Sequence, residues 1–466
     1  MHTDRDYPVV VAGRTLFFGN NVDNHVYAID TRTAAERWRF AAEGSIRFAP
    51  VVHGGRLFFG SDDGHVYCLD ASDGSLVWKY RAGPSGERVI GNSRMISLWP
   101  VRTGLLMEGG TLYLAAGIFP YEGLYVAALE AKTGREIWLN DTSGDQAWGH
   151  QYGGMAPQGY LVASADNLYV PTGRGMPAAF DKRTGKFKKF LHAGGKVGGA
   201  WVQMAGDELY AGNDNQGADT KITFNATSGA NRGDQFASFP SIDMVMTEEV
   251  AYLATQKGLY AIDRAANAKA TADVPKLNKE ETAMVKSIAE IRDRHKAAAK
   301  AGNADDLAKA TTELNQATGR LTAISKEKEA LNAARVKWFM AREQLGPLAV
   351  AGELGPMALA GQTLFAGGNG YTVSLDAKTG RLISIYGVSG TVMSLAVADE
   401  RLFVSTSLGE IHCLGVEDAL PSIPRRMETA NPVALGQAER SIVEEIRRRS
   451  GLANGWCLVA GARDGR

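Results

Sequence analysis

A short motif recurs along the chain and restricts its fold more than any other feature. The segment 68–78 (CLDASDGSLVW) has close copies at 28–38 and 128–138, and weaker copies at 179–189, 223–229, 261–264 and 374–384. Short apolar strand signals such as Leu57-Phe58-Phe59 precede these copies, and eight signals of this kind occur in all. Self-similarity at such a period is typical of repeat proteins, in which each unit buries its core against its neighbours.

Each repeat has the pattern of a small antiparallel sheet. An apolar strand is followed by a turn, a second strand ending in an acidic residue, an Asp/Thr-x-Gly turn and a third strand that carries a tryptophan. A single small sheet leaves one face in water, whereas radial stacking buries both faces. The length of 466 residues alone would suggest about three domains. The repeats instead predict an all-β fold, an eight-bladed β-propeller with seven blades as the alternative.

The string Ala-x-Asp-x-x-Thr-Gly-x-x-x-Trp resembles the repeat of pyrroloquinoline-quinone (PQQ) type, or quinoprotein-like, β-propellers, over roughly residues 8–265 and 346–416. That family includes quinone-dependent alcohol dehydrogenases and cofactor-free outer-membrane assembly lipoproteins. The resemblance implies that three tryptophans dock on the neighbouring blade, beside small residues and turn glycines: Trp38, Trp78 and Trp138, with Ala28, Ala128, Gly74 and Gly134. The first copy has Ala34 at the turn-glycine position, and later copies replace the tryptophan by Lys189 or Ser384.

The segment 266–345 interrupts the repeats, and its composition changes to Ala, Lys and Glu with almost no Gly. Apolar residues recur at steps of three and four on both sides of Gly302-Asn303: Met284, Ile288, Ile291, His295 and Ala298 before it, and Leu307, Ala310, Leu314, Ala317, Leu321, Ile324 and Leu331 after it. This spacing predicts an antiparallel coiled-coil α-helical hairpin between blades 1–6 (residues 1–265) and the last blades (residues 346–418). A long coiled coil has no other evident reason to interrupt a blade, so we expect a protein partner to dock on it.

If the chain resembles the dehydrogenases, it needs a quinone, a calcium ion with oxygen ligands and a carboxylate base. Polar loops that could face the central funnel of the predicted propeller supply low-ranking candidates for cofactor binding, because tryptophans stack on planar rings and cations pair with carboxylates. These candidates are Arg94, Trp99, Arg102, Trp148, His150, Arg174, Lys196, Trp201 and Asp214. Members of the family often carry a vicinal disulfide beside the quinone, whereas Cys68, Cys413 and Cys457 stand far apart. We therefore expect no cofactor, no metal and no catalytic residue, with PQQ and calcium as the alternative.

The tail 419–466 has the pattern of a linker, an amphipathic helix at 437–450, and a buried strand followed by Gly461-Ala462-Arg463-Asp464-Gly465. It resembles the start of an S-adenosylmethionine-dependent methyltransferase domain, in which a glycine-rich turn approaches the cofactor. One strand and one helix cannot form that domain's core, so we expect truncation at this end. The amino end enters the first blade at once, so any signal peptide would lie upstream. The propeller family resemblance implies a periplasmic or extracytoplasmic location.

Charge and hydropathy exclude several classes of partner. Lys and Arg total 51 and Asp and Glu total 51, so no global field favours nucleic acid or an anionic membrane. No window reaches the ~18 apolar residues of a membrane span. Three functions remain: a non-enzymatic binding or scaffold propeller acting through its top-face loops and hairpin, a quinone- and calcium-dependent alcohol-type dehydrogenase, or the recognition module of a longer methyltransferase-type protein. The first is the favoured hypothesis.

Overall fold

The structure is a computed structural model that describes residues 8–91, 94–144, 154–173, 175–191, 201–212, 221–345 and 354–415, together with Glu444. The chain divides into two units, Met1–Leu420 and Pro421–Arg466. Of the second unit only Glu444, in a helix, is described. The linker, helix and methyltransferase-like start predicted for 419–466 therefore lie outside the described residues.

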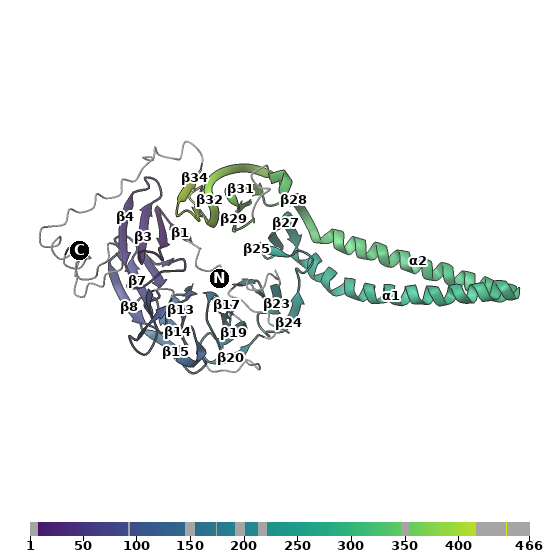
Figure 1. The fold of residues 1–466 in the computed structure, drawn as a ribbon, viewed down its shortest axis with the longest axis horizontal. Coiled ribbons are helices and arrows are strands. Elements are labelled where there is room, and N and C mark those ends of the chain that lie inside the picture. Colours follow the sequence, from purple (N-terminus) through teal and green to yellow (C-terminus); the bar gives the residue numbers. More distant parts are fainter. Residues whose placement is uncertain are drawn as a thin grey trace. The chain divides into compact units, whose positions relative to one another are not determined.

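Antiparallel four-stranded sheets, with strands in sequence order, make up most of the described chain (Figure 1). The first three contain β1 (Val9–Ala12), β2 (Thr15–Gly19), β3 (His25–Asp30) and β4 (Glu36–Ala41); β5 (Val51–His53), β6 (Arg56–Gly60), β7 (His65–Asp70) and β8 (Leu76–Arg81); and β12 (Leu106–Glu108), β13 (Thr111–Ala116), β14 (Tyr125–Glu130) and β15 (Glu136–Asn140). The next three contain β17 (Val162–Ala163), β18 (Asn167–Thr172), β19 (Gly175–Asp181) and β20 (Phe187–Phe190); β21 (Trp201–Ala205), β22 (Glu208–Gly212), β23 (Lys221–Asn225) and β24 (Asn231–Asp234); and β25 (Ser241–Met246), β26 (Val250–Thr255), β27 (Gly258–Asp263) and β28 (Val336–Ala341).

The last sheet has six strands because one long strand takes part in two pairings. Its strands are β29 (Met357–Ala360), β30 (Thr363–Gly367), β31 (Asn369–Asp376), β32 (Leu382–Ala398), β33 (Arg401–Thr406) and β34 (Ile411–Leu414). The first part of β32 pairs with β31, and the part from Val392 onward pairs with β33. Smaller elements lie between the large sheets: the antiparallel pair β9 (Arg88–Gly91) and β10 (Arg94–Ser97), the parallel pair β11 (Thr103–Gly104) and β16 (Gly159–Tyr160), and the 3-10 turns η1 (Pro120–Glu122) and η2 (Arg342–Leu345).

Buried apolar clusters join each sheet to the next along the chain. Phe17 of the first sheet packs with Leu57 of the second, for example, and burying a side chain of this size stabilises the fold by roughly 1.5–3 kcal/mol. Val9 of the first sheet packs with Phe403 of the last, and the Val9 amide donates to Ser394 Oγ at 3.4 Å. The series of sheets therefore closes on itself, which leaves few free edges, as in a β-propeller.

The repeated aspartate explains why the turn between the last two strands of a unit is so short. Asp70 Oδ1 accepts the Ser72 amide at 3.0 Å, and Asp30 Oδ1 accepts the Thr33 amide at 3.0 Å. These bonds satisfy turn amides that the sheet leaves unpaired. Gly74 then has a φ of 75°, which suits glycine, and Ala34 adopts a φ of 57° at the same place in the first sheet.

Two long helices interrupt the sixth sheet between β27 and β28: α1 (Arg264–Ala301) and α2 (Ala304–Arg335), which run side by side (Figure 1). Asp263, the repeat aspartate of this unit, caps α1 by accepting the Ala266 amide at 2.9 Å. Gly302 ends α1 in the left-handed region, and Asn303 caps α2 by accepting the Asp306 amide. No helix among the described residues is both long and apolar enough to cross a membrane.

The two helices contact each other. The buried apolar side chains on them include Ile288, Ile291, Ala298, Ala310 and Ile324. Ion pairs also join the two helices, with Arg294 to Glu313 at 2.6 Å, Arg320 to Glu280 at 2.7 Å and Lys328 to Glu281 at 2.6 Å. Pairing of opposite charges between the helices fixes the register of one helix against the other.

The end of the insertion differs from the expected range. The helix stops at Arg335, and Val336–Ala341 forms β28, which pairs with β27 although 266–345 was expected to be the hairpin. The alternation of Trp338 and Met340 with exposed Lys337 and Phe339 is a strand pattern. The insertion therefore splits one sheet between its third and fourth strands.

Candidate functional site

Four of the nine funnel candidates are described: Arg94, Trp99, Arg102 and Trp201. The other five lie outside the described residues: Trp148, His150, Arg174, Lys196 and Asp214. Arg94, Trp99 and Arg102 all belong to the long connection between β8 and β12, which carries the β9–β10 pair. Their contacts show what each can do.

Arg102 shares the carboxylate of Asp62 with a second arginine. The Asp62 side chain has no exposed surface, and it accepts from Arg102 Nε at 3.2 Å and from an Arg47 guanidinium nitrogen at 2.8 Å. Asp62 lies between β6 and β7, and Arg47 lies between β4 and β5. A buried charge is tolerated only when it is paired. The ion pairs of Asp62 with Arg47 and Arg102 meet this requirement and hold the three connections that carry these residues together. Sequence reasoning missed Arg47 and Asp62, because neither stands in a recognisable motif.

Arg94 and Trp99 hold neighbouring loops together. Arg94 donates to the backbone oxygens of Asn21 at 2.6 Å and Val22 at 3.1 Å, in the connection between β2 and β3. Trp99 is buried, and its Nε1 donates to the Glu122 oxygen of η1 at 2.5 Å. A Cβ on Gly83 would lie 2.7 Å from the Trp99 ring, so the ring is packed against backbone. Neither side chain is available to a planar cofactor in this arrangement.

Trp201 lies in a second polar group, at the start of β21. Lys221 Nζ stands 5.6 Å from the Trp201 ring centroid and donates to the backbone oxygen of Ser241. Asp243, two residues further along β25, accepts the Met357 amide at 2.8 Å and the Met244 amide at 2.8 Å. Burial raises the pKa of Asp243, although these amides and Lys221 act in the opposite direction. Asp243 therefore links the sixth sheet to β29 of the last one.

The three predicted docking tryptophans make the same pair of contacts. Each ring nitrogen donates to a backbone oxygen of the next sheet: Trp38 to Ala71 at 3.2 Å, Trp78 to Ala131 at 3.1 Å and Trp138 to Lys182 at 3.1 Å. Each ring also covers the turn glycine of that sheet, where an added Cβ would lie within 2.7 Å of it: Gly74, Gly134 and Gly185. The tryptophans are thus structural contacts between sheets.

Two further residues dock in the same way, although the sequence indicated neither contact. Trp338 Nε1 donates to Ala377 at 2.9 Å and its ring covers Gly380, but the helical insertion separates Trp338 from its repeat aspartate, Asp263. Lys189 replaces tryptophan in the fourth sheet, and its Nζ donates to the Ser228 oxygen at 2.5 Å. The signal for Trp338 was an aspartate without a nearby tryptophan, followed by a tryptophan directly after a helix.

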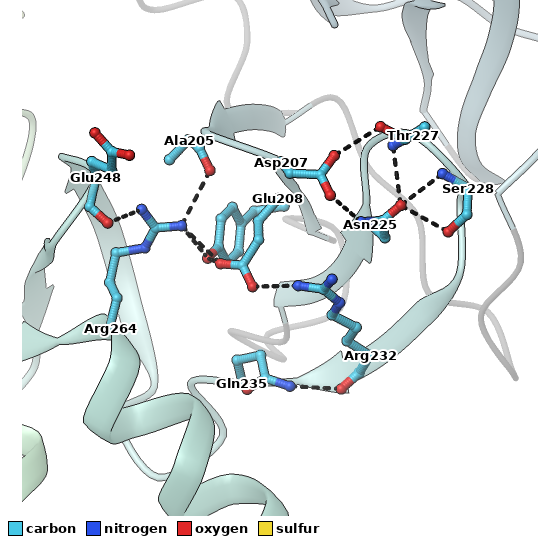
Figure 2. Close-up of polar contacts among 11 residues, drawn as sticks. Ala205, Asp207, Glu208, Asn225, Thr227, Ser228, Arg232, Gln235, Glu248 and Arg264 are labelled. Carbon is cyan, nitrogen blue, oxygen red and sulfur yellow. Dashed lines mark hydrogen bonds and ion pairs between the residues drawn. The ribbon is translucent and has the colours of Figure 1, made fainter.

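The base of the hairpin is fixed by a network of hydrogen bonds and ion pairs (Figure 2). Arg264, the first residue of α1, donates to the backbone oxygens of Thr247 and Glu248, both at 2.7 Å, and of Ala205 at 3.1 Å. Its guanidinium also binds Glu208 at 2.7 Å, and Glu208 binds Arg232 at 2.8 Å. Burial opposes ionisation of Glu208, yet these partners hold its pKa below the usual range.

A second set of contacts fixes the returning helix. Arg335, the last residue of α2, is buried and donates to Asn267 Oδ1 at 2.8 Å, while Asn267 donates to the Gln235 oxygen at 2.8 Å. The Arg335 guanidinium also lies 4.7 Å from the Phe239 ring centroid. The hairpin is therefore anchored through both of its ends to the connection between β24 and β25.

Comparisons with known proteins agree with this fold. The PQQ_2 family model, described as outer membrane protein assembly factor BamB, matches residues 3–140. The assembly factor BamB of Pseudomonas aeruginosa is 29% identical over 136 residues, covering 29% of this chain and 30% of that protein. The quinohemoprotein alcohol dehydrogenase ADH-IIG of Pseudomonas putida is 29% identical over 144 residues, covering 30% of this chain and 18% of that protein. Each match thus spans less than a third of the curated relative.

Solved structures show the same architecture. Sqt1 of Saccharomyces cerevisiae superposes with a TM-score of 0.53 at 11% identity, covering 89% of this chain and 96% of that one. A likeness at this identity concerns the fold alone. The closed series of four-stranded sheets is that of a β-propeller, and over residues 3–140 the chain is similar to the PQQ-type repeat family.

Three described carboxylates between the sheets, Asp62, Asp63 and Asp243, are already engaged by other groups. Calcium takes roughly six to eight oxygen ligands, carboxylates prominent among them. Asp62 is shared by two arginines, Asp63 accepts from Tyr67 at 2.5 Å and from the Glu43 amide, and burial favours the neutral form of Asp243. No group of three His, Cys, Asp or Glu side chains suited to a metal occurs in the described ranges. Burial also raises the pKa of the Cys68 thiol to about 12, which disfavours its thiolate form.

Proposed function

We propose that this chain is a non-enzymatic binding or scaffold protein, an eight-bladed PQQ-type propeller that engages a protein partner through its connecting loops and helical hairpin. The anchored hairpin is the observation that carries the proposal. Arg264 and Arg335 fix its two ends, whereas the polar contacts described for residues 273–328 all stay within the hairpin. A rigid arm with a polar surface adds nothing to the core of a sheet, but it extends the reach of a scaffold.

The eight blades follow from counting the six-stranded sheet as two. β29–β31 with the first part of β32 make one blade, and the rest of β32 with β33 and β34 makes the last. The last blade then packs on the first through Phe403 and Val9. We place the protein outside the cytoplasm, as the resemblance to the assembly factors suggests.

The hairpin can be excised without touching its anchors. Replacing residues 269–333 by Gly-Ser-Gly keeps Arg264, Asn267, Arg335 and the docking Trp338. Full-length and excised proteins, both biotinylated, are incubated with extract of the cells that produce the protein, and bound proteins are quantified by mass spectrometry. We expect at least one protein to be enriched tenfold or more on the full chain and lost on the excised one. Identical sets on two folded proteins would contradict the docking role.

A dehydrogenase is the second candidate function, because one relative is named a quinohemoprotein alcohol dehydrogenase. In this chain Arg102 and Trp99, two of the side chains expected to hold the quinone, are engaged in contacts with Asp62 and Glu122. The described residues therefore favour the binding function over catalysis with a bound quinone.

A further inference from the structure

The β9–β10 pair is a small ribbon with an apolar outer face. Met95 lies opposite Ile90, so both side chains are on one face, with exposed fractions of 55% and 81%. Ile96 lies opposite Val89 on the other face, where Ile96 is buried. Exposure of a side chain such as Ile90 to water costs free energy. Adjacent exposed apolar side chains, here Ile90 and Met95, mark sites of interaction.

The ribbon is held firmly in place. Arg94 of β10 binds the connection between β2 and β3 through the oxygens of Asn21 and Val22. The Ser97 amide donates to the Asp62 oxygen at 2.8 Å, and Trp99 binds Glu122 of η1. The ribbon is thus ordered before any partner arrives, which lowers the entropy cost of binding.

One edge of the ribbon has unused backbone groups. The Leu98 amide donates to the Glu87 oxygen at 2.9 Å. Because hydrogen-bonded pairs alternate along an antiparallel ladder, Val89 and Gly91 face β10, and Arg88 and Ile90 direct their amides and oxygens away from it. Within the described chain we find no partner for these groups. An exposed edge of this kind is a template for an added strand.

Arg88 places a cation beside this edge, and it shares its carboxylate partner with a second cation. Glu43 is paired with both Lys79 at 2.8 Å and Arg88 at 2.6 Å, so two cations share one carboxylate. Arg88 and Ile90 lie two residues apart on the same face of β9.

We propose that β9 is the docking edge for an extended segment of a protein partner. The segment adds a strand beside Arg88 and Ile90, with an apolar residue against Ile90 and Met95 and an acidic residue two positions away against Arg88. This inference rests on the proposed binding function and names the surface and the partner's chemistry.

A random twelve-residue peptide library displayed on phage, selected on the full chain, provides the probe. We expect enriched peptides to share an apolar residue and an Asp or Glu two positions apart. Fluorescein-labelled copies are then titrated by fluorescence polarisation. Ile90→Asp with Met95→Asp should weaken binding at least tenfold, and Arg88→Ala should weaken peptides with the acid but not copies with Gln or Asn in its place. Ile383→Asp, at a residue 50% exposed on β32, is the matched control and should change nothing.

Edge pairing is separated from simple apolar contact by N-methylated copies of the strongest peptide. Methylation of alternate amides should abolish binding in one register and leave it within about twofold in the other, because only every second amide of an added strand faces β9. Peptides that bind the double ribbon variant as tightly as the wild type refute the docking edge and leave the binding function standing. An absence of any enriched peptide refutes the edge as well, while the hairpin excision still decides the binding function.

Discussion

Two connections in this chain begin with the same residue type, an aspartate, and end with a tryptophan docked on the next sheet. They differ in the length and the secondary structure of the segment between these two residues. After β3, Asp30 closes a turn of a few residues, and Trp38 then docks on Ala71 of the next sheet. After β27, Asp263 caps a helix instead, two helices intervene, and Trp338 docks on Ala377 in the same way. Both aspartates accept amides of the residues that follow them, so one local interaction starts both a turn and a helix.

The comparison shows that the contact between sheets does not depend on the length of the connection. Trp38 covers Gly74, and Trp338 covers Gly380, each with the glycine at a positive φ. A long insertion is tolerated at this turn because its two ends emerge side by side, held by Arg335 and Asn267. The insertion therefore leaves the docking contact of its sheet in place.

The largest effect should come from the docking tryptophans themselves. Trp338→Ala and Trp38→Ala each remove a buried ring and its hydrogen bond, and we expect each to lower the free energy of unfolding by about 3–5 kcal/mol. Urea denaturation followed by circular dichroism measures both. If Trp338→Ala costs much less than Trp38→Ala, the two connections are not equivalent.

A smaller loss should follow from filling the space under the ring. Gly380 has a φ of 72°, and a Cβ there would lie 2.6 Å from Trp338, so Gly380→Ala should destabilise the fold by about 1–3 kcal/mol. Gly361→Ala is the matched control, because Gly361 has a φ of 56° and nothing within 4 Å of an added Cβ. Equal losses in the two variants would show that the backbone, and not the ring, determines the cost.

The anchor of the hairpin can be weakened separately. Asn267→Ala removes the acceptor of Nε of the buried Arg335, whose Nη1 also donates to Ser238 and Asn332. This change should cost about 1–3 kcal/mol in the free energy of unfolding. In the excised protein described above, Asn267→Ala should cost the same, since the pair lies outside the excised range. A loss confined to the full chain would place the effect in the helices rather than in the anchor.

The smallest expected effect is a dependence on pH at Asp243. Burial raises the pKa of this carboxyl, so the folded state holds the proton more tightly than the unfolded state. The protonated Asp243 carboxyl contributes its full share to the free energy of unfolding below the ordinary pKa of 3.8. This stabilisation is lost as pH rises through the raised pKa. Asp243→Asn removes the titration, so the stability of the wild type should fall relative to the variant as pH rises above 3.8. Parallel pH profiles for the two proteins would contradict this role.

Much of the fold could be predicted from the sequence because the residues that define each repeat lie close together in the chain. An aspartate, a glycine and a tryptophan within eleven residues encode the turn and the contact of a unit with its neighbour, as at 68–78. Heptad spacing likewise predicted which residues lie between the helices, such as Ile288 and Ile324. Trp338 was missed because that locality is broken by the insertion.

The polar groups could be predicted far less well. Residue type identified Arg94, Trp99 and Arg102 as able to bind a cofactor, but their partners come from distant segments and take up their hydrogen-bonding groups. Nothing in the sequence near Arg102 points to Asp62, which decides whether that guanidinium is free. The exposed edge of β9 was equally hidden, since it depends on which strand lacks a neighbour.

Titration of the full chain with pyrroloquinoline quinone and calcium, followed by calorimetry and by dye reduction with primary alcohols, tests the binding function against catalysis most directly. We expect no saturable heat and no alcohol-dependent reduction of the dye, because Asp62 is engaged by Arg47 and Arg102 and Asp243 by backbone amides. Stoichiometric quinone binding together with alcohol-dependent reduction would show that the chain is an enzyme.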